Sequence, residues 1–397
     1  MWQALKNIYH LFQAICANIY YGFPGRHLIV IGVTGTDGKT TTVNLIYHIL
    51  KMAEQEVSMV STVGANIHGK TLPLGFHVTN PASWQLQKFL SDAAKSKKKP
   101  NYIVLEVSSH GIDQNRVWGI PFKIGVITNI TPEHLDYHKT YENYLATKVR
   151  LLQRASVGII NKDDASFSKI VPLVSSKKII TFGLGKDADI TESMFHYSSP
   201  LVGDFNRYNV LAAVAVCTSI GMNSNQIKIG IESFITPNGR MNSIKNTKGL
   251  SIYIDYAHTA NGIKQALSTL KETKKGKLIA IIGGEGYRDE KKRAIIGEVS
   301  VKLADIVIIT SVDPRGLLAE INMQILQGVK KAKGVLNKNV FIIDDRQEAI
   351  DHAVNFLAQK GDTIAILGKG HERSMNIDGK HEIPWSDAVA VEGALRR

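Results

Sequence analysis

The chain has 397 residues, of which 44% are hydrophobic and 21% are charged, a balance that excludes a disordered or membrane-embedded protein. Its net charge of +13 favours anionic partners such as nucleotides, acidic metabolites, nucleic acid or anionic lipid. No zinc-ligand spacing and no aromatic-rich RNA motif accompanies the charge, so we expect no nucleic-acid partner.

The first segment, residues 2–23, predicts an amphipathic helix. Its apolar residues recur with a helical period at Trp2, Leu5, Ile8, Tyr9, Phe12, Ile15, Cys16 and Ile19. Polar residues interrupt the run, so we expect no transmembrane segment, and no cleavage site of a secretory signal follows. The helix is expected to pack on the domain behind it; contact with a membrane surface or a partner protein is the alternative.

The strip GVTGTDGKTTT, residues 32–42, is the most informative feature of the chain. It lies between an apolar run at residues 28–33, predicted as a strand, and a helical pattern at residues 43–50. A strand, a glycine-rich turn and a helix together hold a polyphosphate, because turn N–H groups and the helix N-terminus face the phosphates. A turn that binds nothing is the alternative, and the flanking strand and helix disfavour it.

Two side chains of this strip are expected to do chemistry. Lys39 is predicted to reach the β- and γ-phosphates, and the Thr40 hydroxyl to ligate Mg²⁺. A strict Walker A motif has glycine where Val33 stands, whereas the extra glycine of this chain is Gly35. The sequence therefore predicts binding of ATP with Mg²⁺ through a variant phosphate loop.

Apolar strand-like runs alternate with helical patterns along the rest of the chain. Further strands are predicted at 102–107, 124–128, 158–161, 179–182, 251–255, 278–283, 306–310, 340–343 and 363–367. Helices are predicted at 84–94, 206–220, 227–234, 262–270 and 293–303. Such alternation indicates α/β architecture with parallel sheets. We expect three segments: an N-terminal helix and linker (1–27), a central P-loop-type ATPase domain (28–240) and a Rossmann-like C-terminal domain (241–397). Both cysteines, Cys16 and Cys217, lie in apolar helical patterns and are expected to be buried thiols of a cytoplasmic protein.

Polar side chains follow the two strands predicted after the phosphate loop. Glu106 closes the first strand, and Ser108, Gln114 and Arg116 come shortly after it. The second strand runs into the motif TPEHLDYH, which contains His134. Because ligands of open α/β sheets bind beyond the carboxyl ends of the strands, these groups are candidates for metal or phosphate contacts. A helix cap or loop contact is the alternative for any one of them.

At this point the sequence resembles the Mur ligases, the ATP-dependent amide ligases of peptidoglycan assembly, and most of all the type that adds the third peptide residue. The motifs that carry the resemblance, in family order, are GVTGTDGKTTT, EVSSHGIDQNRV, TNITPEHLDYHKTYENYLATKVRL, GDFNRYNVLAA, GRMN, IDYAHT, GGEGYRDEKKR, TSVDPRG and GKGHE. The resemblance implies that ATP phosphorylates a substrate carboxylate and that an amine then displaces phosphate from the acyl phosphate.

The resemblance also assigns residues. Lys39, Glu106, His134 and Lys148 would be catalytic, and Thr40, Glu106, His134 and a carbamylated Lys148 would hold Mg²⁺. ATP would be bound by Gly35, Thr36, Asp37, Gly38, Lys39, Thr40, Thr41, Asn129, Asn209, Arg240, Asp255 and His258. A muramoyl-peptide substrate would be held by Thr79, Asn80, Ser108, Gln114 and Arg116. The incoming amino acid would be held by Arg288, Asp313, Arg315, Gly368 and Glu372.

The sequence departs from the family pattern in places. The separate N-terminal domain that binds the UDP end of the substrate is missing from the resemblance, which leaves open how the acceptor's uridine is held. The family motif DNPR reads Val312-Asp313-Pro314-Arg315, and TTP reads Thr79-Asn80-Pro81. Retention of Arg315 favours an amino acid with a distal carboxylate, such as diaminopimelate. Two alternatives stay open: a ligase acting on another acid, of the folylpolyglutamate or poly-amino-acid type, and a non-catalytic ATP-binding partner protein.

Overall fold

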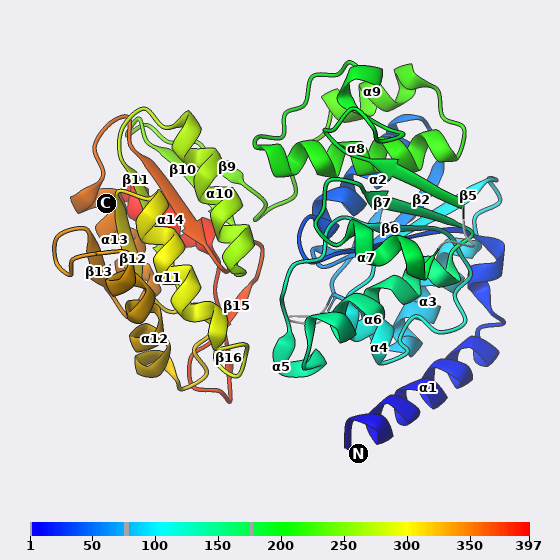
Figure 1. Cartoon of the computed structure of the whole chain (residues 1–397), viewed down its shortest axis with the longest axis horizontal. Helices are drawn as coiled ribbons and strands as arrows, with labels where there is room; N and C mark the ends of the chain where they lie inside the picture. The colour runs from blue at the N-terminus through cyan, green and yellow to red at the C-terminus, as the bar shows by residue number, and fades with distance from the viewer. Residues whose placement is uncertain (1, 75–78, 175–177) are drawn as a thin grey trace. The chain divides into compact units, whose positions relative to one another are not determined.

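The computed structural model describes residues 2–74, 79–174 and 178–397, so Met1, the first residue of the predicted N-terminal segment, lies outside the description. The chain forms two compact units, Met1–Ile235 and Thr236–Arg397. Each unit is built around its own sheet with helices on both faces (Figure 1). The predicted α/β class is confirmed.

The first unit contains an eight-stranded sheet in the order β4-β3-β2-β5-β1-β6-β7-β8. Its strands are β1 (Ile29–Thr34), β2 (Glu56–Ser61), β3 (Gly64–Ile67), β4 (Lys70–Leu72), β5 (Asn101–Glu106), β6 (Phe122–Ile127), β7 (Val157–Asn161) and β8 (Lys178–Phe182). All neighbours pair in parallel except β2 with β3 and β3 with β4. Val33 of β1 is in register with Glu106 of β5 and Val126 of β6. The carboxyl ends of these three strands therefore meet at one edge of the sheet.

Two layers of helices cover this sheet because β1 alternates its side chains between the faces. Ile31 and Val33 pack with α2, α8 and α9, whereas Val30 packs with α3 and α4 on the other face. The helices are α1 (Trp2–Tyr20), η1 (Pro24–His27), α2 (Lys39–Met52), α3 (Ser83–Ala94), α4 (Ser109–Asp113), α5 (Leu135–His138), α6 (Tyr141–Arg154), α7 (Phe167–Ile170), η2 (Val171–Leu173), η3 (Glu192–Met194), α8 (Asp204–Ser219) and α9 (Ser224–Glu232).

The second unit contains a six-stranded sheet in the order β13-β12-β11-β14-β10-β9, in which β9 alone is antiparallel to its neighbour. Its strands are β9 (Asn242–Ile244), β10 (Ser251–Asp255), β11 (Leu278–Ile282), β12 (Ile306–Ile309), β13 (Val340–Ile342) and β14 (Thr363–Leu367), and β15 (Ser374–Asn376) pairs with β16 (Glu382–Pro384) in a hairpin. Its helices are α10 (Ala260–Thr273), α11 (Lys291–Leu303), α12 (Leu318–Lys331), α13 (Arg346–His352), the π-helix η4 (Ala353–Leu357) and α14 (Asp387–Arg396).

The structure contains a strand at every position where the sequence predicts one, with ends that shift by one or two residues. Cys217 is buried and Cys16 is half-buried, and both are free thiols, as predicted except for the partial exposure of Cys16. In the part of the chain that the structure describes, no helix has the length and apolar character needed to cross a bilayer.

Candidate active site

The phosphate-binding loop joins the end of β1 to the start of α2. Two of its glycines are required by close contacts: a Cβ on Gly35 would lie 1.9 Å from Thr128 Oγ1, and one on Gly38 would lie 2.2 Å from Asn209 Oδ1. Gly38 also has a positive φ of 82°, which side chains other than glycine rarely adopt. Helix α2 begins directly after this glycine, so its positive N-terminal end faces the loop.

Asn129, which follows β6, fastens the loop from the neighbouring strand. Its backbone carbonyl accepts from the N–H of Thr36 at 2.9 Å, and its Oδ1 accepts from the N–H of Asp37 at 2.9 Å. Its Nδ2 donates to the Asp37 carbonyl at 3.1 Å. The N–H groups of Thr36 and Asp37, which the sequence suggested would face phosphates, are thus bonded to Asn129. The N-terminal end of α2, with its partial positive charge, is therefore the part of the loop that can bind an anionic phosphate.

Two amines meet at the Gly35 carbonyl. Lys39 Nζ donates to this oxygen at 3.1 Å and to the Thr36 carbonyl at 2.8 Å, and Lys148 Nζ of α6 donates to it at 2.6 Å. Lys148 is only 2% exposed, and its Nζ lies 4.6 Å from the centre of the Tyr144 ring. Burial, followed by the charge of Lys39, holds the pKa of Lys148 well below its usual value. The Lys148 amine therefore loses its proton more readily than that of an exposed lysine.

Glu106, at the end of β5, faces the first turn of α2. Thr40 Oγ1 lies 3.1 and 3.0 Å from the two carboxylate oxygens, and the N–H of Thr62 donates to Oε2 at 2.8 Å. Thr62 Oγ1 in turn donates to Thr79 Oγ1 at 3.2 Å. The carboxylate is 2% exposed, so a buried oxygen-rich group lies beside the phosphate-binding loop.

Asn80 connects the predicted substrate residues to one another. Its Oδ1 accepts from both the N–H and the hydroxyl of Ser108 at 2.7 Å, and its Nδ2 donates to the Glu106 carbonyl at 2.7 Å. Arg116 Nη1 donates to the Asn80 carbonyl at 2.6 Å. The Asn80 side chain is therefore occupied in holding the loop after β5.

The loop that carries His134 packs in a cluster of aromatic rings. The His134 ring lies 4.9 Å from the His110 ring and 6.3 Å from the Tyr144 ring, centre to centre. His138 Nε2 lies 3.0 Å from Ser109 Oγ, and burial lowers the pKa of His138 to about 4. Burial, together with the hydrogen bond to Asp113, raises the pKa of Tyr137 to about 12. The buried Oε1 of Gln114 has no hydrogen-bond partner among the described residues, so it could accept from a ligand.

In the second unit, the predicted nucleotide contacts lie around the end of β10. Asp255 accepts from the N–H of Met241 at 2.6 Å and from that of Ala257 at 2.7 Å. The Arg240 guanidinium lies 4.7 Å from the centre of the Tyr256 ring, and the His258 ring lies 4.6 Å from the same ring. Arg240, Asp255 and His258 thus surround the turn that follows β10.

The predicted amino-acid residues of the second unit form ion pairs. Lys369 Nζ lies 3.0 and 3.1 Å from the oxygens of Asp313 and 2.5 Å from Glu372 Oε2. Both Lys369 and Asp313 are fully buried. The N–H of Asn376 also donates to Asp313 Oδ1 at 2.9 Å. Burial raises the pKa of Asp313 despite the neighbouring lysine.

Glu285 lies among several basic side chains of the second unit. Burial acts to raise its pKa, but the basic side chains of Lys292, His258, Arg288 and Arg315 outweigh burial and lower it to about 2. Arg288 Nε lies 3.6 Å from Glu285 Oε2, and Arg315 Nη1 donates to the Gly286 carbonyl at 3.1 Å. Glu285 is therefore an anion that pairs with Arg288, and the carbonyl of the next residue, Gly286, holds Arg315.

Sequence reasoning missed several residues of this arrangement. They are Thr62, Tyr144, Glu285 and Lys369. Glu285 and Lys369 lie inside the quoted motifs GGEGYRDEKKR and GKGHE, so the motifs themselves held the signal. Tyr144 also lies inside a quoted motif, four residues before Lys148 on α6, whereas Thr62 enters through a contact between distant segments, which the sequence does not display.

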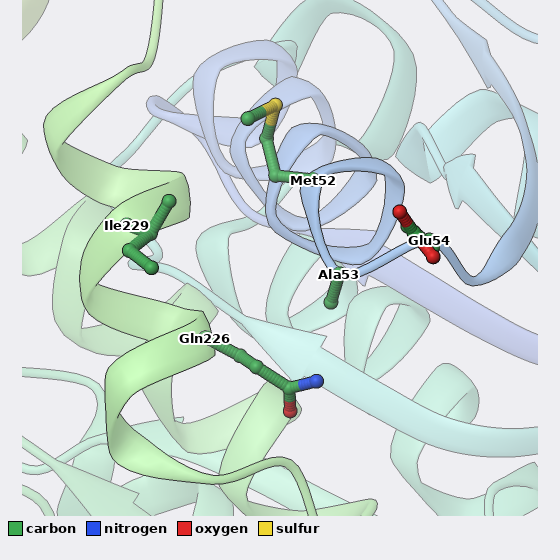
Figure 2. A pocket seen from close by; sticks show the side chains of 5 residues that line it. All are labelled: Met52, Ala53, Glu54, Gln226 and Ile229. Carbon is green, nitrogen blue, oxygen red and sulfur yellow. The ribbon is translucent and has the colours of Figure 1, made fainter.

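A shallow pocket of the first unit lies elsewhere. Figure 2 shows its lining residues, Met52, Ala53, Glu54, Gln226 and Ile229, between the C-terminal end of α2 and α9. The phosphate loop lies at the opposite end of α2, about 20 Å away at the usual rise per residue. None of the predicted site residues lines this pocket, so we assign it no part in the chemistry.

A parallel sheet, a phosphate-binding loop at its edge and a carboxylate beside the following helix define the class of P-loop-type nucleotide-binding enzymes. A family model described as Mur ligase middle domain matches residues 33–217, and one described as Mur ligase, glutamate ligase domain, matches residues 239–370. The chain belongs to the Mur ligase family and is an ATP-dependent amide ligase, as the sequence motifs implied.

Similar proteins cover most of the chain. A UDP-N-acetylmuramoyl-L-alanyl-D-glutamate–2,6-diaminopimelate ligase of Clostridium botulinum is 36% identical over 90% of this chain and 76% of its own length. The protein of the same name from Aquifex aeolicus is 35% identical over 96% of this chain and 80% of its own. A solved structure of such a ligase matches with a TM-score of 0.61 at 33% identity, over 93% of this chain and 78% of that one. A folylpolyglutamate synthase of Mycobacterium tuberculosis shares the fold alone, at 18% identity and a TM-score of 0.69, over 90% of this chain and 92% of that one.

Proposed function

We propose that this ligase adds the third amino acid to a UDP-N-acetylmuramoyl dipeptide in peptidoglycan synthesis, and that the amino acid is 2,6-diaminopimelate. The observation that carries the proposal is the convergence of Lys39, Thr40, Glu106 and Lys148 at one sheet edge. The names of the relatives supply the substrates. The reaction places the enzyme in the cytoplasm, where ATP is available.

In the first step, an oxygen of the acceptor carboxylate attacks the γ-phosphorus of ATP, the bond to the β-phosphate oxygen breaks, and ADP leaves. We infer that Lys39 and the start of α2 hold the transferred phosphoryl group, since such catalysis is mostly positioning and charge stabilisation. In the second step the amine attacks the acyl carbon, phosphate leaves, and the amine loses a proton. The products are an amide, ADP and phosphate.

Mg²⁺ is proposed to bind between Thr40, Glu106, His134 and a carbamylated Lys148. The donor set fits, because the Thr40 hydroxyl and the Glu106 carboxylate already lie within 3.1 Å of each other and provide the oxygen ligands that this ion prefers. Within residues 2–74, 79–174 and 178–397, no three His, Cys, Asp or Glu side chains form a cage for a metal ion. A magnesium site that relies on one or two carboxylates and substrate phosphates needs no such cage. When bound, the ion would neutralise charge on the phosphates.

Carbamylation of Lys148 follows from its surroundings. A neutral amine attacks CO₂, whereas an ammonium cannot, and burial lowers the pKa of Lys148. The nitrogen forms a bond to the CO₂ carbon and loses one proton to solvent, which leaves a carbamate anion. The neighbouring Lys39 would stabilise this anion, whereas it repels the ammonium form of Lys148. The side chain would thereby change from a hydrogen-bond donor into an oxygen ligand.

The acceptor is proposed to bind along the loop after β5, at Thr79, Ser108, Gln114 and Arg116. Asn80 holds this loop through its hydrogen bonds, so we assign it the positioning of Ser108 and Arg116. The amino acid is proposed to bind in the second unit. There, arginines can face its carboxylates and acids its ammonium group.

The test is a matrix of reactions with ATP, Mg²⁺, UDP-N-acetylmuramoyl-L-alanyl-D-glutamate and either meso-diaminopimelate or L-lysine. We expect phosphate release and a tripeptide product, identified by mass, with diaminopimelate only. Arg315→Ala should raise the KM for diaminopimelate about tenfold or more. Release of phosphate with a folate or a free polyglutamate, and none with the muramoyl dipeptide, would overturn the proposal.

A further inference from the structure

Helix α1 docks on the first unit through its polar face. Gln3 Nε2 donates to Tyr137 Oη at 2.8 Å, Asn7 Nδ2 donates to Asp113 Oδ2 at 2.9 Å, and Asn18 Nδ2 donates to the Trp118 carbonyl at 3.0 Å. Among the described side chains of α1, the buried ones are those of Ala14, Ala17 and Asn18. Surface helices of globular proteins normally bury their apolar stripe, so α1 has the reverse orientation.

The apolar face of α1 is therefore exposed. Its large side chains are between 54% and 73% exposed and follow a helical spacing, at Leu5, Ile8, Tyr9, Phe12, Ile19 and Tyr20. At the end of the helix, Tyr20, Tyr21 and Trp84 of α3 form an aromatic group with ring centres 4.9 to 6.4 Å apart. Figure 1 shows α1, in blue, along the periphery of the first unit. Aromatic side chains with one apolar and one polar end suit a membrane–water interface.

Basic side chains lie on the segments that directly follow α1 and α3. Arg26 of η1, directly after α1, is exposed, as are Lys95, Lys97, Lys98 and Lys99, which follow α3. Lys99 Nζ lies 3.5 Å from the His27 carbonyl, which joins the two groups. Asp92 pairs with Lys95, and α1 itself contains no Asp or Glu. We call these five cations the basic cluster.

We propose that the apolar face of α1 and the basic cluster bind the surface of an anionic lipid bilayer. The apolar side chains would enter the boundary between headgroups and acyl chains, and the basic cluster would contact lipid phosphates. The length and polarity of α1 exclude a spanning mode and suit an interfacial one. A lipid surface matches both features at once, because it offers apolar depth beside negative charge. This proposal does not depend on which acceptor or amino acid the ligase uses.

The test is sedimentation of the full chain with vesicles. We expect binding to equimolar phosphatidylcholine and phosphatidylglycerol, weaker binding to phosphatidylcholine alone, and a loss of binding as salt rises. Ile8→Ser with Phe12→Ser should weaken binding by roughly tenfold or more. The matched control is Ile235→Ser with Phe356→Ser, which removes the same residue types from exposed positions outside α1 and should bind as the wild type does.

A second set of variants tests the charge. Lys97→Gln, Lys98→Gln and Lys99→Gln together should weaken binding to the anionic vesicles roughly tenfold to hundredfold and flatten its salt dependence. Lys186→Gln, Lys330→Gln and Lys338→Gln remove the same charge elsewhere and should have little effect. Wild-type protein that does not bind anionic vesicles at low salt would overturn the proposal. So would a wild-type dimer that Ile8→Ser with Phe12→Ser converts to monomer without any vesicle binding, since a second copy would then cover the face.

Discussion

In the first unit, the amines of Lys39 and Lys148 donate hydrogen bonds to backbone carbonyls. In the second unit, by contrast, the amine of Lys369 forms ion pairs with two carboxylates, those of Asp313 and Glu372. The first arrangement is fixed by the turn of the phosphate loop, by Asn129 and by glycines that admit no side chain. The second arrangement is a network of ion pairs, in which a change of one residue alters the charge that its neighbours face. We propose that the phosphate loop of the first unit serves phosphoryl transfer, and that the charged network of the second unit serves recognition of the amine.

The largest effect is expected at the phosphate loop. Lys39→Ala should lower kcat by roughly 10³-fold, because it removes the charge that meets the transferred phosphoryl group. The measurement is amino-acid-dependent phosphate release at saturating substrates. Lys51→Ala, an exposed lysine at the other end of α2, is the matched control and should keep wild-type activity. Equal losses in the two variants would break the assignment of the phosphoryl step to this loop.

Lys148 of the first unit is a buried amine, as Lys369 of the second unit is, but it lies against a carbonyl and not between carboxylates. Lys148→Ala should lower kcat by roughly 10²-fold or more, since it removes a ligand of the proposed metal site. Wild-type activity should fall in CO₂-stripped buffer and return with bicarbonate, whereas the residual activity of the variant should not respond. As pH falls through the lowered pKa of Lys148, its amine becomes protonated, and the bicarbonate effect should vanish. A wild-type enzyme that ignores bicarbonate and carries no added CO₂ by mass would contradict carbamylation.

In the second unit, Asp313→Asn removes one of the two carboxylates that pair with Lys369 and leaves the ion pair with Glu372. We expect the KM for the amino acid to rise about tenfold with kcat within about threefold, and thermal stability to fall, because a buried ion pair is broken. Kinetics at varied amino-acid concentration and a thermal melt measure the two effects. Glu392→Gln, an exposed acid of α14, is the control. A collapse of kcat at unchanged KM would instead place Asp313 in the chemical step.

The smallest effect concerns His138, beneath the loop that carries His134. Its pKa is about 4 in the folded chain and near 6.5 when unfolded, so the unfolded chain takes up the proton first as pH falls. The stability associated with the neutral ring is complete above about pH 6.5 and is lost progressively towards pH 4. His138→Gln should flatten this part of the stability profile by about 1–2 kcal/mol, measured by urea unfolding between these pH values. An unchanged profile would show that His138 is not the titrating group.

The sequence located the buried parallel strands, because strands covered on both faces read as apolar runs. It did not locate β2, whose run Glu56–Ser61 mixes Ser and Glu with apolar residues, or the short antiparallel strands β3, β4, β9, β15 and β16. The motifs indicated that Lys39, Glu106 and Lys148 belong to one site, and these residues do lie together around the phosphate loop. They could not reveal that Asn129 occupies the N–H of Asp37 or that Asn80 holds Ser108, since these contacts join segments distant in the chain.

The division of labour between the units has one direct test. ATP labelled with ¹⁸O in the β,γ-bridge scrambles its label when the acyl phosphate forms reversibly, so this exchange reports the first step without the amine. With the muramoyl dipeptide and no amino acid, we predict exchange in the wild type and in Arg315→Ala, although Arg315→Ala forms little amide, and none in Lys39→Ala. Loss of exchange in Arg315→Ala together with loss of amide formation would contradict the account, because Arg315 would then be needed for phosphoryl transfer and not only for recognition of the amine.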